Sequence, residues 1–523
     1  MNQRPSVMNG VFFGGNIVKV YLVGAGPGDP GLLTLKGRDA LACADVVVYD
    51  ELACDGLLSY AKPGAELVYV GKVAGDHALP QHKINALLVE KAKKGKVVTR
   101  LKGGDPYVFG RGGEEAEVLA KAGVPFEEVP GISSAIAAPA YAGIPVTHRD
   151  FASSVTIVTG HENPDKGSAA HNWSAIAASA STLVFVMGVK NLPHIVKNLL
   201  AVGMDPQIPA AVVYRGTTPR QRSLACPLAD LPGAVRKAGF TNPSVIVVGR
   251  VAELRGRLNW FEHKPLFGRS MVVTRACEQA SGLADALGSL GAEVIQFPTI
   301  AIRPTPDFTE MDAAVARLSE YGWVIFTSMN GVRHFFMRLA AAGKDSRALA
   351  GCKVAAIGPA TAIALAGCGI TADFVPKHYV AEGVLKGLHT ATSGSLAGVR
   401  ILLPCAAKSR DVLPKELAKA GALVDMAKAY ITLPAASRKD EMLARIKIGA
   451  LDCVTFASSS TVENFLALIP AELLKKHPEI RLAAIGPVTK KTLQKHGLDC
   501  HISPAEYTIP ALVEAVKQYY SAL

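Results

Sequence analysis

An internal duplication in the second half of the chain constrains its fold more than any other feature. The segment 324–330, Val-Ile-Phe-Thr-Ser-Met-Asn, recurs 130 residues later at 454–460 as Val-Thr-Phe-Ala-Ser-Ser-Ser. The segment 355–361, Ala-Ala-Ile-Gly-Pro-Ala-Thr, recurs at 483–489 with an offset of 128 residues. A long pattern that occurs only twice predicts two similar lobes rather than a solenoid. Because small ligands bind between domains, we expect a binding cleft between the two lobes.

The whole chain alternates between short apolar runs and helical patterns. Near-continuous apolar runs, typical of buried parallel strands, lie at 18–23, 46–49, 182–187, 244–248, 271–274, 323–327 and 400–403. Helical periodicity follows many of them, as at 33–43, 83–94 and 113–122. This pattern predicts an α/β protein in which helices cover parallel sheets.

Composition excludes several classes of protein. Apolar residues make up 49% and charged residues 19%, which is typical of a packed globular chain. No stretch reaches the ~18 apolar residues of a membrane helix, and residues 1–16 lack the apolar core of a secretory signal. Nine scattered cysteines without a CxxC pair predict free thiols in a reducing cytoplasm, with no disulfides and no metal site. The net charge of +12 is spread, with 6% aromatics, which favours a small polyanion over nucleic acid as partner.

A glycine-rich segment, Gly-Ala-Gly-Pro-Gly-Asp-Pro-Gly at 24–31, follows the first apolar strand. Such a loop could bind a dinucleotide, with Asp50 as the ribose ligand about 20 residues further on. Pro27 and the Asp29-Pro30 pair, however, stand where a helix should open beneath a pyrophosphate. A nicotinamide oxidoreductase is therefore a disfavoured alternative. A second alternative is that the loop is rich in glycine only because the chain turns there.

Five further motifs follow apolar strands, at the positions where an open α/β sheet places its ligand loops. They lie at 71–72 (Gly-Lys), 100–106 (Arg-Leu-Lys-Gly-Gly-Asp-Pro), 109–115 (Phe-Gly-Arg-Gly-Gly-Glu-Glu), 129–135 (Val-Pro-Gly-Ile-Ser-Ser-Ala) and 143–149 (Gly-Ile-Pro-Val-Thr-His-Arg). In this order they resemble the tetrapyrrole methylase family, specifically its uroporphyrinogen-III C-methyltransferases, over residues 17–260. The resemblance implies two α/β lobes with a boundary near residue 130, and a homodimer.

The same resemblance implies methyl transfer from S-adenosylmethionine to C2 and C7 of uroporphyrinogen III, giving precorrin-2 on the route to sirohaem or cobalamin. A sulfonium donor needs alignment with a nucleophilic carbon rather than a metal. Glycine lets the backbone approach a folded cofactor closely, and Asp105 can bond its polar groups. By resemblance, the cofactor-binding residues are Pro27, Gly103, Gly104, Asp105, Val108, Ser133, Ser134, Met187 and Gly216. Family members commonly have Thr-Ala at the position of Ser133-Ser134, so the second residue is more polar here.

The implied substrate carries eight carboxylates, and arginine is their natural bidentate partner. Arg111 and Arg149 are therefore the candidate substrate clamps, and Glu114 could accept hydrogen bonds from pyrrole N–H groups. The alternative is that Arg111 and Glu114 simply pair with each other at the start of a helix.

Methylation of a pyrrole carbon requires that a proton leave elsewhere on the macrocycle. By resemblance, Asp50 is the proton acceptor and Lys72 the proton donor. Asp50 follows the apolar run 46–49, at the carboxyl edge where an acid or base is expected. An N-cap for the next helix is the competing and compatible interpretation of Asp50.

The second half, from about residue 264 to residue 523, resembles the uroporphyrinogen-III synthase family. The resemblance implies cyclisation of hydroxymethylbilane to uroporphyrinogen III, with inversion of ring D, release of water and no cofactor. We expect a linker at 261–267 after an N-terminal extension (1–16) and the first enzyme (17–260). The synthase, at 268–523, would divide into one lobe of 268–298 with 432–523 and another of 303–430, hinged by antiparallel crossings near 298–304 and 430–434.

Candidate groups in the synthase half recur at equivalent positions of the two repeats. Hydroxyls at helix N-termini can anchor substrate carboxylates, and the candidates are Thr327, Ser328, Thr361, Ser458 and Thr489. Tyr430 resembles the family tyrosine that assists loss of the hydroxyl. Helix N-capping is the alternative role for each Ser and Thr. A further alternative is that only the methyltransferase half is active, the C-terminal half being a tetrapyrrole-binding module.

Overall fold

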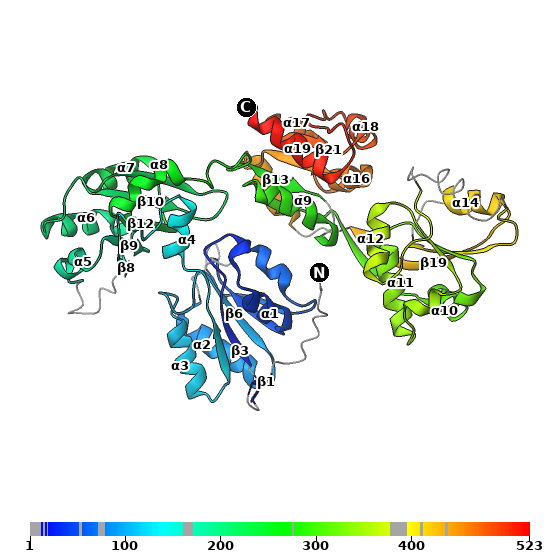
Figure 1. Ribbon diagram of the computed structural model, residues 1–523, viewed down its shortest axis with the longest axis horizontal. Helices are drawn as coiled ribbons and strands as arrows, with labels where there is room; N and C mark the ends of the chain where they lie inside the picture. Colours follow the sequence, from blue (N-terminus) through cyan, green and yellow to red (C-terminus); the bar gives the residue numbers. More distant parts are fainter. Residues whose placement is uncertain are drawn as a thin grey trace. The chain divides into compact units, whose positions relative to one another are not determined.

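The computed structural model describes residues 12–13, 16–17, 19–51, 55–71, 79–160, 171–274, 277–376, 395–407, 412–434 and 438–522. The chain divides into two compact units. The first comprises Met1–Arg269, Leu287–Glu293 and Tyr520–Leu523, and the second Ser270–Ala286 and Val294–Tyr519. Both units are α/β, which confirms the predicted fold class (Figure 1). Among the described helices, none is long and apolar enough to cross a membrane.

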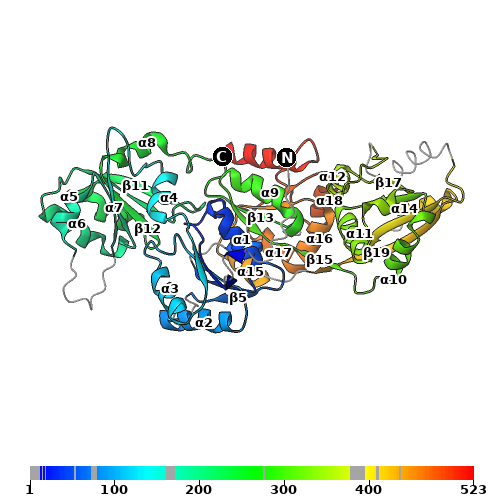
Figure 2. The same ribbon diagram turned by 60° about the horizontal axis from the view of Figure 1, so that its bottom comes forward.

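The first sheet of the first unit is parallel and has the strand order β5-β4-β6-β3-β7. Its strands are β3 (Val20–Gly24), β4 (Val46–Tyr49), β5 (Glu66–Tyr69), β6 (Val98–Lys102) and β7 (Phe126–Val129). Helices α2 (Gln81–Lys93) and α3 (Gly112–Lys121) pack together on one face, and α1 (Leu35–Cys43) covers the other (Figures 1 and 2). The near-continuous apolar runs arise because both faces of the sheet are buried.

The second sheet of this unit corrects the prediction of parallel strands throughout. Its order is β11-β10-β12-β9-β8, and β12 is antiparallel to both β10 and β9, although 244–248 was expected to be a parallel strand. Only the β8–β9 pair is parallel among the pairs of this described sheet. The strands are β8 (Val155–Thr159), β9 (Thr182–Val186), β10 (Pro209–Tyr214), β11 (Arg222–Pro227) and β12 (Ser244–Val248). A buried strand has the same apolar composition in either direction, so the run could not report its orientation.

Helix α4 (Ser134–Tyr141) begins shortly after β7 and packs against the second sheet, with Ala135 and Ala138 in its core. The chain thus passes from the first sheet to the second near residue 130. The remaining helices of this lobe are α5 (Trp173–Ser179), α6 (Leu192–Ala201), α7 (Leu231–Ala238) and α8 (Arg255–Leu258).

Two segments lie at the expected domain edges. Residues 12–13 and 16–17 form a short antiparallel pair, β1 and β2, and the first long strand begins at Val20 rather than at residue 18. In the expected linker, Phe261 and Leu266 are 4% and 0% exposed. The carboxylate of Glu262 accepts hydrogen bonds from the side chains of Gln221, Ser223, Arg255 and Asn259. The stretch 261–267 is therefore packed into the first unit.

The second unit contains two sheets with matching strand orders, as the duplication predicts. One has the order β14-β13-β20-β21, and the other β15-β19-β18-β16-β17, in which β15 is an added edge strand. The strands are β13 (Ser270–Val273), β14 (Glu293–Gln296), β15 (Ile300–Pro304), β16 (Trp323–Phe326), β17 (Lys353–Ala356), β18 (Arg400–Ala406), β19 (Leu423–Pro434), β20 (Cys453–Phe456) and β21 (Arg481–Ala484). Each sheet has its own apolar core.

Helices surround these two sheets. They are α9 (Cys277–Ser289), α10 (Thr309–Ala316), α11 (Met329–Ala341), α12 (Pro359–Gly367), α14 (Val412–Lys419), α15 (Lys439–Lys447), α16 (Ser459–Leu468), α17 (Ala471–Lys475), α18 (Pro487–Lys495) and α19 (Ile509–Ser521). The repeated segments of the sequence form β16 with the start of α11 and β20 with the start of α16. The second pair forms β17 with α12 and β21 with α18.

Strands β15 and β19 pair antiparallel where crossings were expected. Ile300 lies opposite Pro434, and Pro304 lies opposite Tyr430. On its other side, β19 pairs parallel with β18, and the register shifts between Cys405 and Ala406. Such an irregularity redirects a side chain. Tyr430, opposite Ala406 in the shifted register, is 9% exposed.

Candidate active sites

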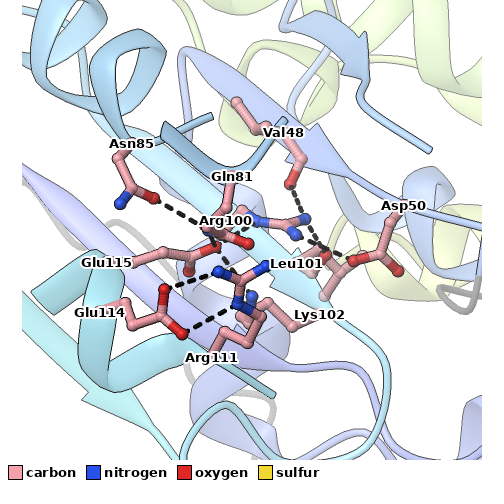
Figure 3. A network of polar contacts seen from close by, with 10 residues as sticks. All are labelled: Val48, Asp50, Gln81, Asn85, Arg100, Leu101, Lys102, Arg111, Glu114 and Glu115. Atoms are coloured by element: carbon pink, nitrogen blue, oxygen red, sulfur yellow. Dashed lines mark hydrogen bonds and ion pairs between the residues drawn. The ribbon is translucent and has the colours of Figure 1, made fainter. Parts of the chain in front are cut away.

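A buried cluster of charged side chains lies between β6 and the helices α2 and α3. Successive side chains of a strand point to opposite faces, so Arg100 and Lys102 share the face of Val98, toward α2 and α3. Arg100 is 3% exposed, Lys102 is 4% exposed, and Glu115 of α3 is fully buried. Figure 3 shows the three side chains converging. Such burial of charge is rare unless the groups are paired.

One oxygen of Glu115 receives all the contacts of the cluster. Oε1 accepts hydrogen bonds from Gln81 Nε2 at 2.9 Å, Arg100 Nε at 3.3 Å and Lys102 Nζ at 2.8 Å. Oε2 has no hydrogen-bond partner within the described part of the chain, and a buried acceptor without a partner costs about 1–3 kcal/mol. Burial, together with the charge of Arg100, lowers the pKa of the Lys102 ammonium.

Asp50 is connected to this cluster at the carboxyl edge of the sheet. It follows β4, whose Val48 lies opposite Arg100 in β6. Arg100 Nη2 donates to Asp50 Oδ2 at 2.9 Å, while Arg100 Nη1 donates to the Leu101 carbonyl at 3.0 Å. The Asp50 side chain is 26% exposed. Its carboxylate is therefore bonded to the buried Arg100 and also accessible to solvent. Lys72, the proposed proton donor, lies outside the described residues.

Three loops meet backbone to backbone beside this edge. A Cβ atom on Gly131 would lie 2.2 Å from the Gly104 carbonyl oxygen, and one on Gly24 would lie 2.4 Å from Gly131 Cα. These approaches require glycine. Gly104 has a φ of +68°, and the atom nearest to a Cβ there would be Ser134 N, 3.9 Å away. The Gly103-Gly104 turn therefore leaves open space beside its backbone, which fits close approach by a ligand.

Asp105 organises these loops through its carboxylate. Oδ1 accepts hydrogen bonds from Tyr107 N at 2.8 Å and Val108 N at 3.0 Å, and Oδ2 accepts one from Gly131 N at 3.0 Å. The carboxylate thus fixes the turn that carries Gly103 and joins it to the loop after β7. The sequence predicted that the Asp105 side chain binds the cofactor. It did not predict the hydrogen bonds to backbone N–H groups, because the motif does not show which loops lie beside Asp105.

The loop after β3 touches the loop after β10. Asp29 N donates to Thr217 Oγ1 at 3.2 Å, and the Tyr141 hydroxyl donates to Asp29 Oδ2 at 2.7 Å. A Cβ on Gly28 would lie 2.6 Å from Thr218 Cγ2, and one on Gly216 would lie 2.3 Å from Ala138 Cβ. The structure thus brings together the loops that carry Pro27 and Gly216, two of the expected cofactor-binding residues. Sequence spacing carried no signal for the roles of Tyr141 and Thr217.

The other expected cofactor-binding residues lie in neighbouring loops. Ser133 caps α4 and accepts a hydrogen bond from Ala135 N at 3.3 Å, and Ser134 is the first residue of that helix. Val108 follows the Gly103-Gly104 turn, and Met187 follows β9. Their side chains are 40% and 45% exposed, which is unusual for large apolar residues.

Backbone strain is concentrated in the same loops. Six non-glycine residues of the described chain have a positive φ, and five of them lie in the loops after β6, β9 and β10. Those five are Phe109, Arg111, Met187, Arg215 and Thr217. Such conformations cost of the order of 1–3 kcal/mol each and cluster at functional sites. This signal appears in the backbone angles and has no counterpart in the sequence.

The two arginines expected to clamp the substrate are at the surface. Arg111 makes two hydrogen bonds to Glu114, Nε to Oε1 at 2.9 Å and Nη2 to Oε2 at 2.8 Å. The alternative pairing is thus present, and it lowers the pKa of the Glu114 carboxyl. Both side chains remain more than half exposed, and an exposed ion pair is worth about 0–1 kcal/mol, so a substrate carboxylate can displace it. Arg149 is also exposed.

In the second unit, Tyr430 lies beside the first turn of α11. Its phenol oxygen is 3.2 Å from Ser328 Oγ, which also accepts a hydrogen bond from Gly331 N at 3.1 Å as the N-cap of the helix. The ring of His334 stacks on that of Tyr430, with 5.7 Å between centroids and 23° between planes. Thr327, next to Ser328, is exposed. Sequence reasoning missed His334, which follows Ser328 by six residues along the helix that faces β19.

The remaining hydroxyls occupy equivalent positions in the two repeats. Ser458 caps α16 in a capping box with Thr461. Thr361 and Thr489 lie in the first turns of α12 and α18, and each is 4% exposed. N-capping therefore describes both Ser328 and Ser458, while the backbone N–H groups of the same helix ends remain candidates for anion binding. No group of three or more His, Cys, Asp or Glu residues among those described could hold a metal ion.

Comparison with known proteins follows the same division. The model for tetrapyrrole (corrin/porphyrin) methylases matches residues 19–232, and the model for uroporphyrinogen-III synthase HemD matches residues 281–514. The porphyrin biosynthesis protein HemD of Ruminiclostridium josui is 37% identical over 498 residues, which cover 95% of this chain and 97% of that protein. The S-adenosyl-L-methionine-dependent uroporphyrinogen III methyltransferase of Methanosarcina barkeri is 51% identical over 46% of this chain and 94% of its own.

Among solved structures, the uroporphyrin-III C-methyl transferase of Thermus thermophilus complexed with S-adenyl homocysteine is 42% identical. The match covers 45% of this chain and 99% of that one, with a TM-score of 0.39.

Proposed function

Since the chain belongs to the tetrapyrrole methylases over residues 19–232 and to the uroporphyrinogen-III synthases over residues 281–514, we propose that it catalyses two consecutive steps of tetrapyrrole biosynthesis. The C-terminal half cyclises hydroxymethylbilane to uroporphyrinogen III without a cofactor. The N-terminal half methylates that product at C2 and C7 with S-adenosylmethionine, giving precorrin-2 for sirohaem or cobalamin. The similarity to one protein over 95% of the chain, across both halves, is the observation that carries this proposal.

For the methyltransferase half, the proposed cofactor site is formed by the loops after β3, β6, β7, β9 and β10. When bound, S-adenosylmethionine supplies an electrophilic methyl group. The open backbone at Gly104 supports placing the cofactor beside the turn that Asp105 fixes. Val108 and Met187 present exposed apolar surface there. The remaining residues proposed to bind it are Pro27, Gly103, Ser133, Ser134 and Gly216.

We assign the acid–base steps to groups at the carboxyl edge of the first sheet. Asp50 accepts the proton that leaves the macrocycle after methylation, and the 2.9 Å contact with Arg100 keeps its carboxylate in place. Lys72 remains the proposed donor. Arg111, Arg149 and Glu114 bind the substrate, the arginines through its carboxylates.

For the synthase half, we propose that Tyr430 assists departure of the hydroxyl from hydroxymethylbilane. Its phenol donates a hydrogen bond or a proton to that oxygen as the carbon–oxygen bond breaks and water forms. The Ser328 hydroxyl, 3.2 Å away, supports a fixed direction for the phenol. Thr327, Thr361, Ser458 and Thr489, with the neighbouring helix N-termini, anchor substrate carboxylates.

A single assay tests both halves. Purified protein is supplied with hydroxymethylbilane, with and without S-adenosylmethionine, and the products are identified. We expect uroporphyrinogen III without the methyl donor and precorrin-2 with it. Accumulation of the uninverted isomer at the uncatalysed rate would mean that the C-terminal half only binds tetrapyrrole. We further propose a cytoplasmic homodimer without nucleic-acid or membrane partners, and sedimentation measures its oligomeric state.

A further inference from the structure

The buried side chains of Arg100, Lys102 and Glu115 form a cluster, and the proposed acid–base chemistry assigns none of them a direct role. Two cations surround one carboxylate, and all three residues are at most 4% exposed. Buried ion groups of this kind contribute little net stability, because desolvation offsets their mutual attraction. In addition, Glu115 Oε2 is buried without a hydrogen-bond partner among the residues that the structure describes. Stability alone therefore does not account for this arrangement.

Arg100 links the cluster to the proposed proton acceptor. Its guanidinium bonds Glu115 through Nε at 3.3 Å, Asp50 through Nη2 at 2.9 Å and the Leu101 carbonyl through Nη1 at 3.0 Å (Figure 3). A guanidinium is planar and rigid, so contacts on three of its nitrogens fix both its position and its orientation. The position of Asp50 Oδ2 thus depends on an anchor two side chains away.

Glu115 is itself held from two directions. Lys102 Nζ donates to Oε1 at 2.8 Å from the strand, and Gln81 Nε2 donates to the same oxygen at 2.9 Å from α2. Gln81 Nε2 also donates to Asn85 Oδ1 at 2.9 Å. The result is a continuous set of contacts from α2 and α3 to the end of β4, in which Gln81 and Asp50 are partly exposed and the other members are buried.

We propose that Glu115 is a positioning residue for methyl transfer, acting through Arg100 to set the carboxylate of Asp50. The inference rests on the proposed role of Asp50 as proton acceptor. Glu115 touches neither substrate nor cofactor in this scheme. Its loss should leave both binding steps intact and slow the step in which Asp50 takes the proton, because a small misplacement of a reacting group can reduce a rate by about a hundredfold.

A double-mutant cycle tests this proposal in the full chain. The variants are Glu115→Gln, Asp50→Asn and the two combined, with Glu117→Gln, an exposed residue of the same helix, as matched control. Turnover is measured on supplied uroporphyrinogen III, and calorimetry gives the affinities for S-adenosylmethionine and for the tetrapyrrole. Glu115→Gln should lower kcat by about tenfold to a hundredfold, with both affinities within about twofold of wild type. Glu117→Gln should match wild type.

The decisive comparison is the effect of Glu115→Gln in the Asp50→Asn background. Groups that act as one unit are strongly non-additive, so the second substitution should cause no further loss of kcat. Equal fractional losses in both backgrounds would overturn the inference and leave Asp50 as the acceptor. A wild-type kcat for Asp50→Asn would instead overturn the proposed role of Asp50, and the inference with it.

A second variant covers the case in which Glu115→Gln does not fold. Glu115→Asp keeps the charge but shortens the side chain by one methylene, so that its carboxylate no longer reaches Arg100 and Lys102 together. The proposal requires the same selective loss of kcat for this variant, with wild-type affinities. A kcat equal to that of wild type in a folded Glu115→Asp protein would contradict it.

Discussion

Ser328 Oγ lies 3.2 Å from the phenol oxygen of Tyr430, although 102 residues separate the two in the chain. The contact joins the N-cap of α11 to β19, directly after the register shift between β18 and β19. Ser328 already accepts a hydrogen bond from Gly331 N. Either hydroxyl can donate in the contact between Ser328 and Tyr430, and when Ser328 donates, the phenol proton can point toward a ligand.

We predict that Tyr430→Phe slows enzymatic closure of hydroxymethylbilane. Removing one hydrogen-bond donor that stabilises a departing oxygen typically costs about a hundredfold in rate. More substrate then escapes to spontaneous cyclisation, so the ratio of isomer III to isomer I should fall. Chromatographic separation of the oxidised isomers measures this ratio.

Ser328→Ala separates the catalytic role of Tyr430 from a packing role. The alanine variant keeps the tyrosine hydroxyl but loses its neighbour and the helix cap, which costs about 0.5–2 kcal/mol of stability. We expect a lower melting temperature and a smaller loss of closure rate than in Tyr430→Phe. If the phenylalanine variant retains the wild-type rate and isomer ratio, Tyr430 serves packing alone.

Asp105→Ala should weaken binding of S-adenosylmethionine while ring closure continues at the wild-type rate. The substitution leaves the backbone N–H groups of Tyr107, Val108 and Gly131 without their acceptor, so the turn beside Gly104 loses its fixed shape. Each lost hydrogen bond to a charged group is worth about 1.5–3 kcal/mol, or roughly tenfold to a hundredfold. Calorimetry with the cofactor and the closure assay measure the two effects. Equal loss of methyl transfer and ring closure would contradict the expectation that the two halves fold and act independently.

The periodicity of the sequence predicted where elements lie better than how they are oriented. The apolar runs 46–49 and 244–248 have the bounds of β4 and β12, because buried strands on two-sided sheets are apolar throughout. The run 18–23 is displaced to Val20–Gly24. The antiparallel direction of β12 depends on the hairpin between β10 and β11, which the apolar pattern does not encode.

The location of Asp50 followed from a simple rule, since parallel strands end at one edge of the sheet. The groups that hold it did not. Arg100 and Lys102 are charged residues two apart within a buried strand, which was an unused signal that a carboxylate must lie on that face. Identifying Glu115 as this carboxylate required the packing of α3 against β6, and tertiary contacts of that kind are not local properties of sequence.

Arg111→Ala and Arg149→Ala should each impair methyl transfer through the affinity for uroporphyrinogen III. One charge-assisted contact to a substrate carboxylate contributes about tenfold to a hundredfold. Arg111→Ala should show the smaller loss, because the free arginine is already bonded to Glu114 and must exchange that partner. Calorimetry with the tetrapyrrole and with the cofactor is the measurement. Weaker affinity for the cofactor, with unchanged affinity for the tetrapyrrole, would show that these arginines bind the cofactor rather than the substrate.

Finally, the burial of Lys102 predicts a pH-dependent difference in stability between the wild type and Lys102→Met. Burial lowers the folded-state pKa of Lys102 below its ordinary value of 10.5. Between the lowered folded pKa and the unfolded pKa, the unfolded chain binds the extra proton, so the free energy of unfolding rises with pH.

The melting temperature of the wild type should therefore rise relative to that of Lys102→Met as the pH increases toward the ordinary lysine pKa of 10.5. Titrating groups far from Lys102 are common to both proteins, so their contributions cancel in the difference. A difference in melting temperature that stays constant with pH, or that changes in favour of the variant, would mean that burial and the charge of Arg100 do not destabilise the charged form of Lys102.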